Sequence, residues 1–184
     1  AASFEQAIRL QPKFVDAWSN WGNALSDLQR YAEAVQAYDQ ALALQPQHAN
    51  ALNNRASALL SLRQYAQALR DFDLSIQLQP QVAQTYMHSA VALLGLGQYA
   101  AALESSDMAL QLQPAMVKAH WCRVSALQSL KQYSAAAAAC DSVLALDPDY
   151  PYAQGVALQV RLAACDWQDY DQRVAAVREG VRAG

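Results

Sequence analysis

Apolar residues recur along this chain in steps of three and four, which is the spacing of one face of an α-helix. One such stretch holds Leu25, Leu28, Ala34, Tyr38 and Ala41. The whole pattern repeats every 34 residues, and three residue types hold the same phase in four successive units. They are the tyrosines Tyr31, Tyr65, Tyr99 and Tyr133, the alanines Ala34, Ala68, Ala102 and Ala136, and the prolines Pro46, Pro80, Pro114 and Pro148. A fixed period of this length indicates an array of one structural unit.

Each unit is predicted to be a pair of antiparallel helices joined by a tight turn. Two helices approach to roughly 8–10 Å only where the facing side chains are small, which accounts for the recurring alanines. The prolines are expected just after the second helix, because proline lacks a backbone N–H and clashes with the preceding turn. The pattern therefore predicts an all-α protein.

Six residues of the first unit match the pattern of the tetratricopeptide repeat at its expected phase. They are Trp18, Gly22, Ala34, Tyr38, Ala41 and Pro46. The chain thus resembles tetratricopeptide-repeat proteins over nearly its whole length. The resemblance implies a right-handed superhelical solenoid of antiparallel helix pairs.

In this register, full repeats are predicted at residues 15–48, 49–82, 83–116 and 117–150. Residues 1–14 match the second helix of a truncated repeat, so further repeats are expected upstream. Residues 151–184 are predicted to form a degenerate repeat and a capping helix. Arg55 and Arg123 replace a large apolar residue of the pattern, and Ser106 and Cys140 replace an aromatic one. These departures are expected to thin the packing.

The charge balance narrows the function classes. The formal net charge is −3 and the pI is near 5.5. No basic face for nucleic acid or anionic lipid is therefore expected. No uncharged apolar run approaches the roughly 20 residues of a membrane-spanning helix, so the chain is predicted to be cytoplasmic, with neither nucleic acid nor membrane as a partner.

The candidate chemistry is sparse. Cys122, Cys140 and Cys165 lack the spacing of a disulfide or metal pair and are predicted to be reduced packing residues. His88 and Cys122 share a phase in adjacent units, but a Cys–His nucleophile also needs an orienting group and a lowered thiol pKa. No phosphate-binding loop or metal-ligand cluster is found. No catalytic residue, metal site or cofactor is predicted, and this chain is not expected to be an enzyme.

Candidate binding residues follow from the repeat geometry. The first helix of each repeat should form the inner wall of the array, with positions two, five, six, nine, twelve and thirteen facing inward. We call these the wall positions. In the first two repeats they are mostly polar, and the predicted peptide-binding residues are Asp16, Asn20, Asn23, Asn50, Asn53 and Asn54. In the next two the wall becomes bulkier, and the predicted residues are Met87, His88, Lys118 and Trp121.

A row of asparagines has a specific use in this setting. An amide side chain both donates and accepts hydrogen bonds, so it can bind the backbone of an extended peptide without reading its side chains. Met87 and Trp121 are candidate anchors, because a buried interface aromatic typically carries about 2 kcal/mol or more. Two alternatives stay open: the asparagines can be solvated surface residues, and Trp121 can pack against a neighbouring helix.

One known use of these repeats is not predicted here. A subclass holds the acidic carboxyl-terminal tails of chaperones with a clamp of cations and asparagines. In this chain Ser19, Gln84 and His88 stand where the cations should be, so the charge that holds a terminal carboxylate is missing.

The segment Cys165-Asp166-Trp167 departs from the repeat pattern. Asp166 is predicted to cap a final helix from about Gln168 to Arg182, and Trp167 to cover the end of the core. This segment and the asparagine-rich repeats resemble the junction in O-GlcNAc transferases and their bacterial relatives, where the repeats precede a glycosyltransferase domain. The resemblance implies an arm that presents extended protein substrates to that domain.

Two hypotheses follow. In the first, the chain is the substrate-recruiting arm of a larger O-GlcNAc transferase-like enzyme. In the second, it is a free-standing scaffold for complex assembly with no attached enzyme. Both predict proteins or peptides in extended conformation as partners, and the Ala-rich outer helices also favour a homo-oligomer. A nucleotide-sugar-binding domain encoded after Gly184 would distinguish the two.

Overall fold

The structure is a computed structural model that describes residues 14–183, and within this range it contains ten helices and no strand. The predicted all-α solenoid fold is confirmed. The helix predicted within residues 1–14 falls almost entirely outside the described residues. The chain divides into two compact units, one up to Gly97 and one from Gln98 onward.

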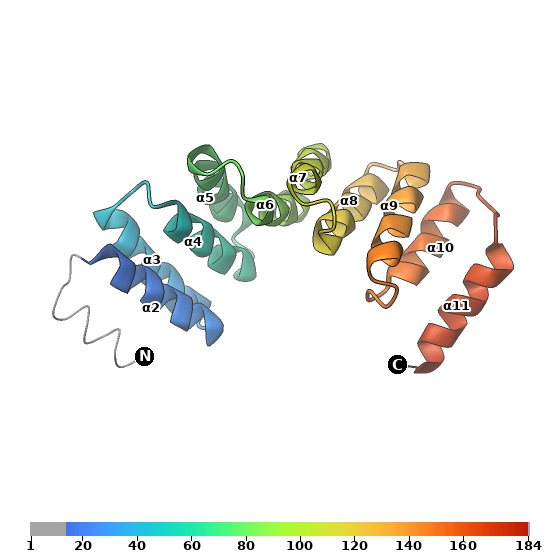
Figure 1. The fold of residues 1–184 in the computed structure, drawn as a ribbon, viewed down its shortest axis with the longest axis horizontal. Coiled ribbons are helices and arrows are strands. Elements are labelled where there is room, and N and C mark those ends of the chain that lie inside the picture. Colours follow the sequence, from blue (N-terminus) through green and yellow to red (C-terminus); the bar gives the residue numbers. More distant parts are fainter. Residues whose placement is uncertain (1–13, 184) are drawn as a thin grey trace. The chain divides into compact units, whose positions relative to one another are not determined.

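The first unit contains α2 to α6 and the second contains α7 to α11 (Figure 1). The helices of the first unit are α2 (Val15–Asp27), α3 (Tyr31–Leu44), α4 (Ala49–Ser61), α5 (Tyr65–Leu78) and α6 (Ala83–Gly95). Those of the second are α7 (Tyr99–Leu112), α8 (Val117–Ser129), α9 (Tyr133–Leu146), α10 (Ala153–Ala163) and α11 (Tyr170–Ala183). Within each unit every helix packs against the next, and in the first unit α4 also contacts α2 and α6.

The recurring residues of the sequence mark the ends of the helices. Each of the four periodic tyrosines is the first residue of a helix, and each of these helices ends two residues before a periodic proline. The residue between helix and proline is extended, as at Gln45, where φ is −139° and ψ is 90°. Proline disfavours the helical conformation for the residue before it, so the chain leaves the helix at this point.

The turns inside the helix pairs share one backbone motif that the sequence analysis did not identify. A residue with positive φ recurs every 34 positions, at Gln29, Arg63, Gly97, Lys131 and Cys165. At Gln29 the N–H donates to the carbonyl of Ser26, and the next N–H, of Arg30, donates to the carbonyl of Leu25. This is the Schellman arrangement, which satisfies carbonyls that a helix end leaves unpaired. Only one of the five positions is glycine, so the pattern of turn residues gave no signal.

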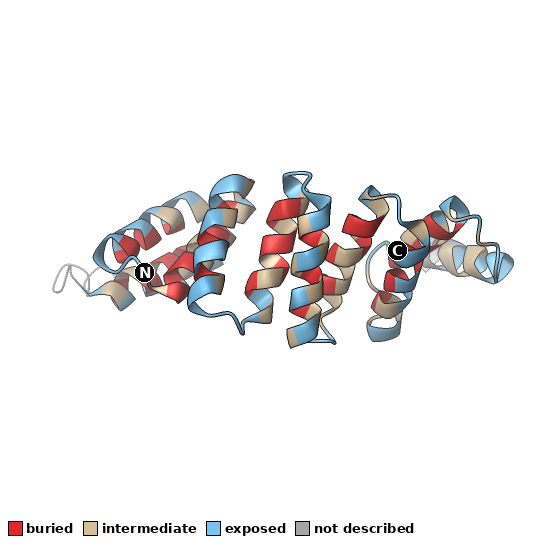
Figure 2. Cartoon of the chain, turned by 90° about the horizontal axis from the view of Figure 1, so that it is seen from above, coloured by how far each residue is buried: buried red, intermediate tan, exposed pale blue. Residues whose placement is uncertain are grey.

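The core of the first unit forms where helices approach closely (Figure 2). Ala34 and Ala68 are fully buried, and Tyr38 and Phe72 fill the space beside them. Gly22 is required by this packing, because a Cβ there would lie 2.5 Å from the Tyr38 ring. The absence of a side chain at Gly22 lets the tyrosine ring lie directly on α2.

The second unit has its own core of smaller side chains. Val124, Leu127, Cys140, Val143 and Val160 are buried together there. Ser106 and Cys140, which depart from the repeat pattern, are both fully buried. The Ser106 hydroxyl donates to the Ala102 carbonyl at 2.7 Å, so its burial leaves no donor unpaired.

Arginine–aspartate pairs tie successive helices together. Arg55 on α4 donates two hydrogen bonds of 2.7 Å to the buried carboxylate of Asp71 and a third, of 2.6 Å, to Asp39. On α8, Arg123 donates to Asp107 at 2.8 Å. The arginines at apolar positions of the pattern therefore act as cross-links between helices, and a two-bond contact fixes geometry better than a single bond.

A third arginine makes the same link at the carboxyl-terminal end. Arg161 on α10 is buried, and its Nη2 donates to Asp141 on α9 at 2.6 Å. Its Nε lies 3.5 Å from Asp166 Oδ2, and Arg173 of α11 lies 3.9 Å from Asp141. Asp166 therefore belongs to an ion-pair cluster that holds the end of the array.

The predicted cap at this end is wrong in two respects. Asp166 accepts a hydrogen bond from Gln168 N in a turn, and α11 begins only at Tyr170, because Asp169 has a positive φ of 55° that interrupts the helix. Trp167 does not cover the core: it is 63% exposed and packs edge-on against Tyr170 at 5.7 Å.

The glycine packing predicts a measurable asymmetry between two substitutions. Gly22→Ala should lower the free energy of unfolding by about 1–3 kcal/mol, because the added methyl group clashes with the Tyr38 ring. The matched control is Gly155→Ala in α10, where the added Cβ would meet no atom within 4 Å apart from its chain neighbours and the backbone of its own helix. Alanine there should be neutral or stabilise by up to about 1 kcal/mol. Urea titrations followed by circular dichroism measure both, and equal effects would contradict the packing at Gly22.

Candidate functional site

A shallow pocket lies on the first unit where α2 and α4 run beside each other. Its volume is about 320 Å³. Six of its lining residues occupy wall positions on these two helices: Asn23, Ser26, Asp27, Asn54, Ser57 and Ser61. Ala58 of α4 and Tyr31 and Tyr38 of α3 complete the lining. The pocket is therefore mostly polar, and its chemistry is that of amides, hydroxyls and one carboxylate.

Two predicted asparagines meet in this pocket. Asn54 Nδ2 donates to Asn23 Oδ1 at 2.9 Å, which links α4 to α2. The Tyr38 hydroxyl donates to the same oxygen at 2.8 Å. Burial raises the pKa of Tyr38, so the hydroxyl stays protonated and remains a donor at neutral pH. Part of the asparagine row thus cross-links neighbouring repeats.

The tyrosines of the pocket were missed by the sequence analysis, which considered only first helices. Tyr38 reaches the pocket from the second helix, across the space left open by Gly22. The glycine one residue before Asn23 was the available signal, because a missing side chain admits a large one from a neighbour.

The other predicted residues of the first two repeats fall into two groups. Asn20 and Asn50 are exposed, on α2 and α4 respectively. Asn53 is half-buried, and its Oδ1 accepts a hydrogen bond from Thr85 at 3.2 Å, which links α4 to α6. Asp16 is exposed and lies 3.5 Å from His48 Nε2. Asn20 and Asn50 are the amides whose surroundings leave them open to solvent.

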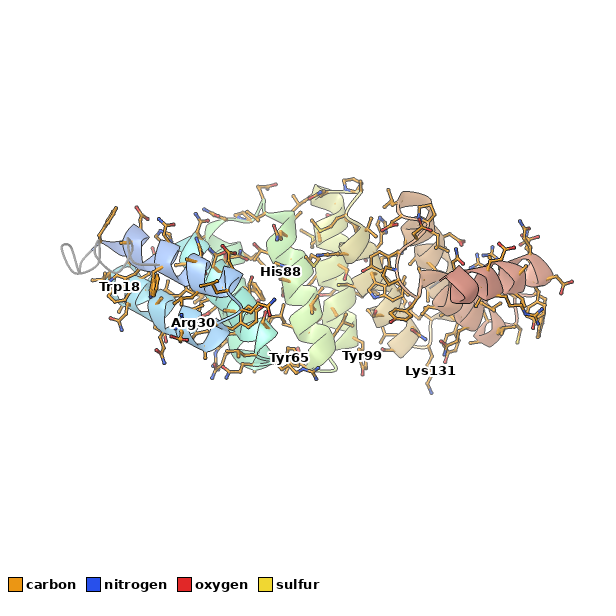
Figure 3. The ribbon with its side chains drawn as sticks, turned by 90° about the horizontal axis from the view of Figure 1, so that it is seen from below. Trp18, Arg30, Tyr65, His88, Tyr99 and Lys131 are labelled. Atoms are coloured by element: carbon orange, nitrogen blue, oxygen red, sulfur yellow. The ribbon has the colours of Figure 1, made fainter. Side chains whose placement is uncertain are left out.

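Met87, predicted as an anchor on the wall, is buried in the structure. It is only 6% exposed, so it belongs to the packing of α6 and is not available as an anchor. His88 projects from the same helix (Figure 3) and is half-buried. Its ring lies 5.9 Å from that of Phe72, and its Nδ1 lies 3.5 Å from the Ser57 hydroxyl. The periodic side chains of α6 therefore turn partly toward α4 and α5.

The two candidates of the second unit differ from each other. Lys118 is exposed on α8. Trp121 is half-buried, packs against the core of this unit and lies 5.2 Å from the Tyr150 ring at an angle of 49°. This geometry corresponds to the packing alternative for Trp121.

Three family models match the sequence, and each is described as a tetratricopeptide repeat. They cover residues 15–48, 37–70 and 89–151, which together make up more than half of the chain. The chain is built of tetratricopeptide repeats. No curated protein matches the sequence.

Solved structures with the same fold extend over nearly the whole repeat array. YrrB, described as a tetratricopeptide-repeat protein with an unusual peptide-binding site, is 19% identical, with a TM-score of 0.83 over 96% of this chain and 91% of its own. MamA from Desulfovibrio magneticus RS-1 is 19% identical, with a TM-score of 0.84 over 92% and 96%. A thermophilic tetratricopeptide-repeat protein from Thermus thermophilus is 22% identical, with a TM-score of 0.68 over 91% and 90%. At these identities the likeness is one of fold.

Cys122 and Cys140 lie in surroundings that disfavour the thiolate, the form in which a cysteine acts as a nucleophile. Burial raises the pKa values of Cys122 and Cys140 to about 11, so both are neutral thiols at pH 7. Among the described residues, no group of three or more histidine, cysteine, aspartate or glutamate side chains is placed to hold a metal ion. None of the described helices combines the length and the apolar character needed to cross a membrane.

The bond between Asn23 and Asn54 predicts an energetic coupling between two repeats. Asn23→Ala and Asn54→Ala should each destabilise the chain, and their double-mutant cycle should give a coupling of about 0.5–1.5 kcal/mol. Asn20→Ala is the matched control, because Asn20 is exposed on the same helix as Asn23. Equilibrium unfolding measures the four free energies. Additive losses at Asn23 and Asn54 would contradict the bond.

Proposed function

We propose that this tetratricopeptide-repeat chain binds proteins or peptides in extended conformation along the wall formed by α2 and α4. The observation that carries the proposal is the pocket of about 320 Å³ where wall residues of two repeats converge, flanked by exposed amides on the same helices. The printed description of YrrB, which names a peptide-binding site, adds support at the level of the fold.

The amides suit an extended backbone. Asn20 and Asn50 are exposed, so their donors and acceptors can meet the N–H and C=O groups of a bound strand. Asn23 and Asn54 use one side of each amide on each other, which leaves Asn23 Nδ2 and Asn54 Oδ1 without a hydrogen bond among the described residues. Because backbone groups are common to all sequences, this binding tolerates different segments.

The remaining predicted residues take graded roles in the proposal. Asp16 on α2 and Lys118 on α8 are exposed and can add charged contacts, each within its own unit. Asn53 and His88 are placed mainly to order the wall, through their contacts with Thr85 and Ser57. Trp121 contributes through packing, and Met87 takes no part.

An attached enzyme is the finer form of the proposal. The segment Cys165-Asp166-Trp167 and the asparagine-rich repeats resemble O-GlcNAc transferase-like proteins, in which such an arm recruits substrates for a glycosyltransferase domain. A cytoplasmic location belongs to the same proposal. Its test is whether the gene encodes a nucleotide-sugar-binding α/β domain after Gly184, and whether captured proteins carry attached sugars.

The free-standing scaffold is favoured by a different observation. Asp166 forms an ion pair with Arg161 and accepts a hydrogen bond from Gln168 N. These contacts give Asp166 a structural role that needs no following domain. Exposed leucines on the second helices, Leu44, Leu74 and Leu78, also suit self-association of such a scaffold. Sedimentation at several concentrations tests the homo-oligomer.

The proposed binding surface predicts which amides a bound segment needs. A phage-displayed library of random peptides provides binders to the wild-type chain. For these binders, the double substitution Asn20→Ala and Asn50→Ala should weaken affinity about fivefold to 150-fold, because each removes a hydrogen bond of about 0.5–1.5 kcal/mol. Unfolding curves should be unchanged, since both residues are exposed.

The matched control removes two exposed amides from α3, the second helix of the first repeat. Gln36→Ala and Gln40→Ala on α3 should leave the affinity as it was, because they lie on the helix that does not form the wall. Equal losses from both double variants, or no loss from the first, would contradict binding along α2 and α4.

A further inference from the structure

The pocket between α2 and α4 offers several hydrogen-bond acceptors beside the amide donors of Asn23 and Asn54. The Ser57 hydroxyl donates to the Asn53 carbonyl at 2.9 Å, and the Ser61 hydroxyl donates to the Ser57 carbonyl at 3.1 Å. Each hydroxyl has a single proton, so both oxygens offer lone pairs and no donor to a ligand, and the Ser57 oxygen also lies 3.5 Å from His88 Nδ1. Asn54 donates through Nδ2 to Asn23, and its Oδ1 is a further acceptor.

Asp27 adds a formal charge to these acceptors. It is the last residue of α2, it is exposed, and it lines the pocket. Among the described residues it forms no ion pair. The nearest arginines along the chain are Arg30 and Arg63, and neither lines the pocket. Arg30 forms an ion pair with Glu33. Within residues 14–183, no cationic side chain forms an ion pair with this carboxylate.

The ends of two helices reinforce this negative character. Asp27 ends α2 and Ser61 ends α4, and both residues line the pocket. The carboxyl-terminal end of a helix carries a partial negative charge of roughly half an electron, which favours a nearby cation. Neither helix has a basic residue in its last turn. Among the described residues, no lysine or arginine lines the pocket.

We propose that this pocket selects a basic side chain, a lysine ammonium or an arginine guanidinium, of the bound extended segment. These groups carry three and five donors and no acceptor, and the Asp27 carboxylate, the oxygens of Ser57 and Ser61 and Asn54 Oδ1 can accept from them. The ring of Tyr31, which also lines the pocket, adds an aromatic surface of the kind that attracts such cations. The inference rests on the proposed function. It identifies the side chain that the bound segment would place beside Asp27.

Two short peptides that differ only in charge test the selectivity. The probes are acetyl-Ser-Ala-Lys-Ala-Ser-amide and the same peptide with norleucine in place of lysine, so the backbone is identical and only the ammonium changes. Nitrogen-15 NMR of the full chain follows the side-chain amides of Asn23 and Asn54 and the backbone amides of Asp27 and Ser61. The lysine peptide should bind about tenfold more tightly than the norleucine peptide, as expected for one charge-assisted contact.

Two carboxylate variants locate the source of the preference. Asp27→Asn should reduce the tenfold ratio to about one, because the side chain keeps its shape and loses its charge. Asp73→Asn is the matched control: Asp73 is exposed on α5, outside the pocket, and forms no ion pair among the described residues. It changes the net charge of the chain equally and should preserve the ratio.

The outcomes separate this inference from the function on which it rests. If both peptides shift these resonances with equal affinity, the proposed selection of a basic side chain is wrong, and the backbone-binding proposal still stands. A preference that Asp27→Asn and Asp73→Asn reduce equally would also overturn it, since the cause would be net charge. If the lysine peptide shifts none of the four resonances at about 10 mM, the pocket inference is wrong, while the phage-derived binders judge the proposed function independently.

Discussion

Close contact between helices at residues without bulk is the constraint on which this structure depends. Ala34, Ala68, Ala102 and Ala136 are each fully buried. In the first unit, the Tyr38 ring lies so close to the backbone of Gly22 that any side chain at this position would clash with it. One helix pair has too little apolar surface to form a core by itself, so burial is shared between neighbours and stability is close to a sum of local terms.

The same close contact determines what the polar residues do. Where two first helices lie side by side, an asparagine on one reaches an asparagine on the next, as Asn54 reaches Asn23. Arg55 spans from α4 to carboxylates on both α3 and α5. Pairing matters at such positions, because leaving a buried donor or acceptor unpaired costs about 1–3 kcal/mol. Amides that look equivalent in sequence are therefore divided between holding repeats together and facing solvent.

This division explains which candidate residues could be found from the sequence. The wall positions follow from helical periodicity, and six of them do line the pocket of the first unit. The periodicity does not give the depth of each side chain. Met87 is buried although it shares its repeat position with the half-buried Asn53 and Trp121, because burial depends on the volume of neighbours that the period does not encode. Tyr38 reached the site from another helix for the same reason.

The carboxyl-terminal end shows the limit in a second way. Asp166 before a run of polar residues has the composition of a helix cap, yet positive φ values at Cys165 and Asp169 redirect the backbone and place Asp166 beside Arg161. A local signal such as a cap is weak, about 1 kcal/mol, so a buried arginine that needs a carboxylate outweighs it.

By itself the sequence determined the helix pairs, the end of each second helix before a proline, and the period that makes them an array, because these depend on local backbone preferences and on the spacing of apolar residues. Only the tertiary structure decided which polar side chains cross-link repeats, which line the pocket and which stay in water. Those assignments depend on distances between residues some 31 positions apart, as for Asn23 and Asn54, and such distances are set by how one helix packs on the next.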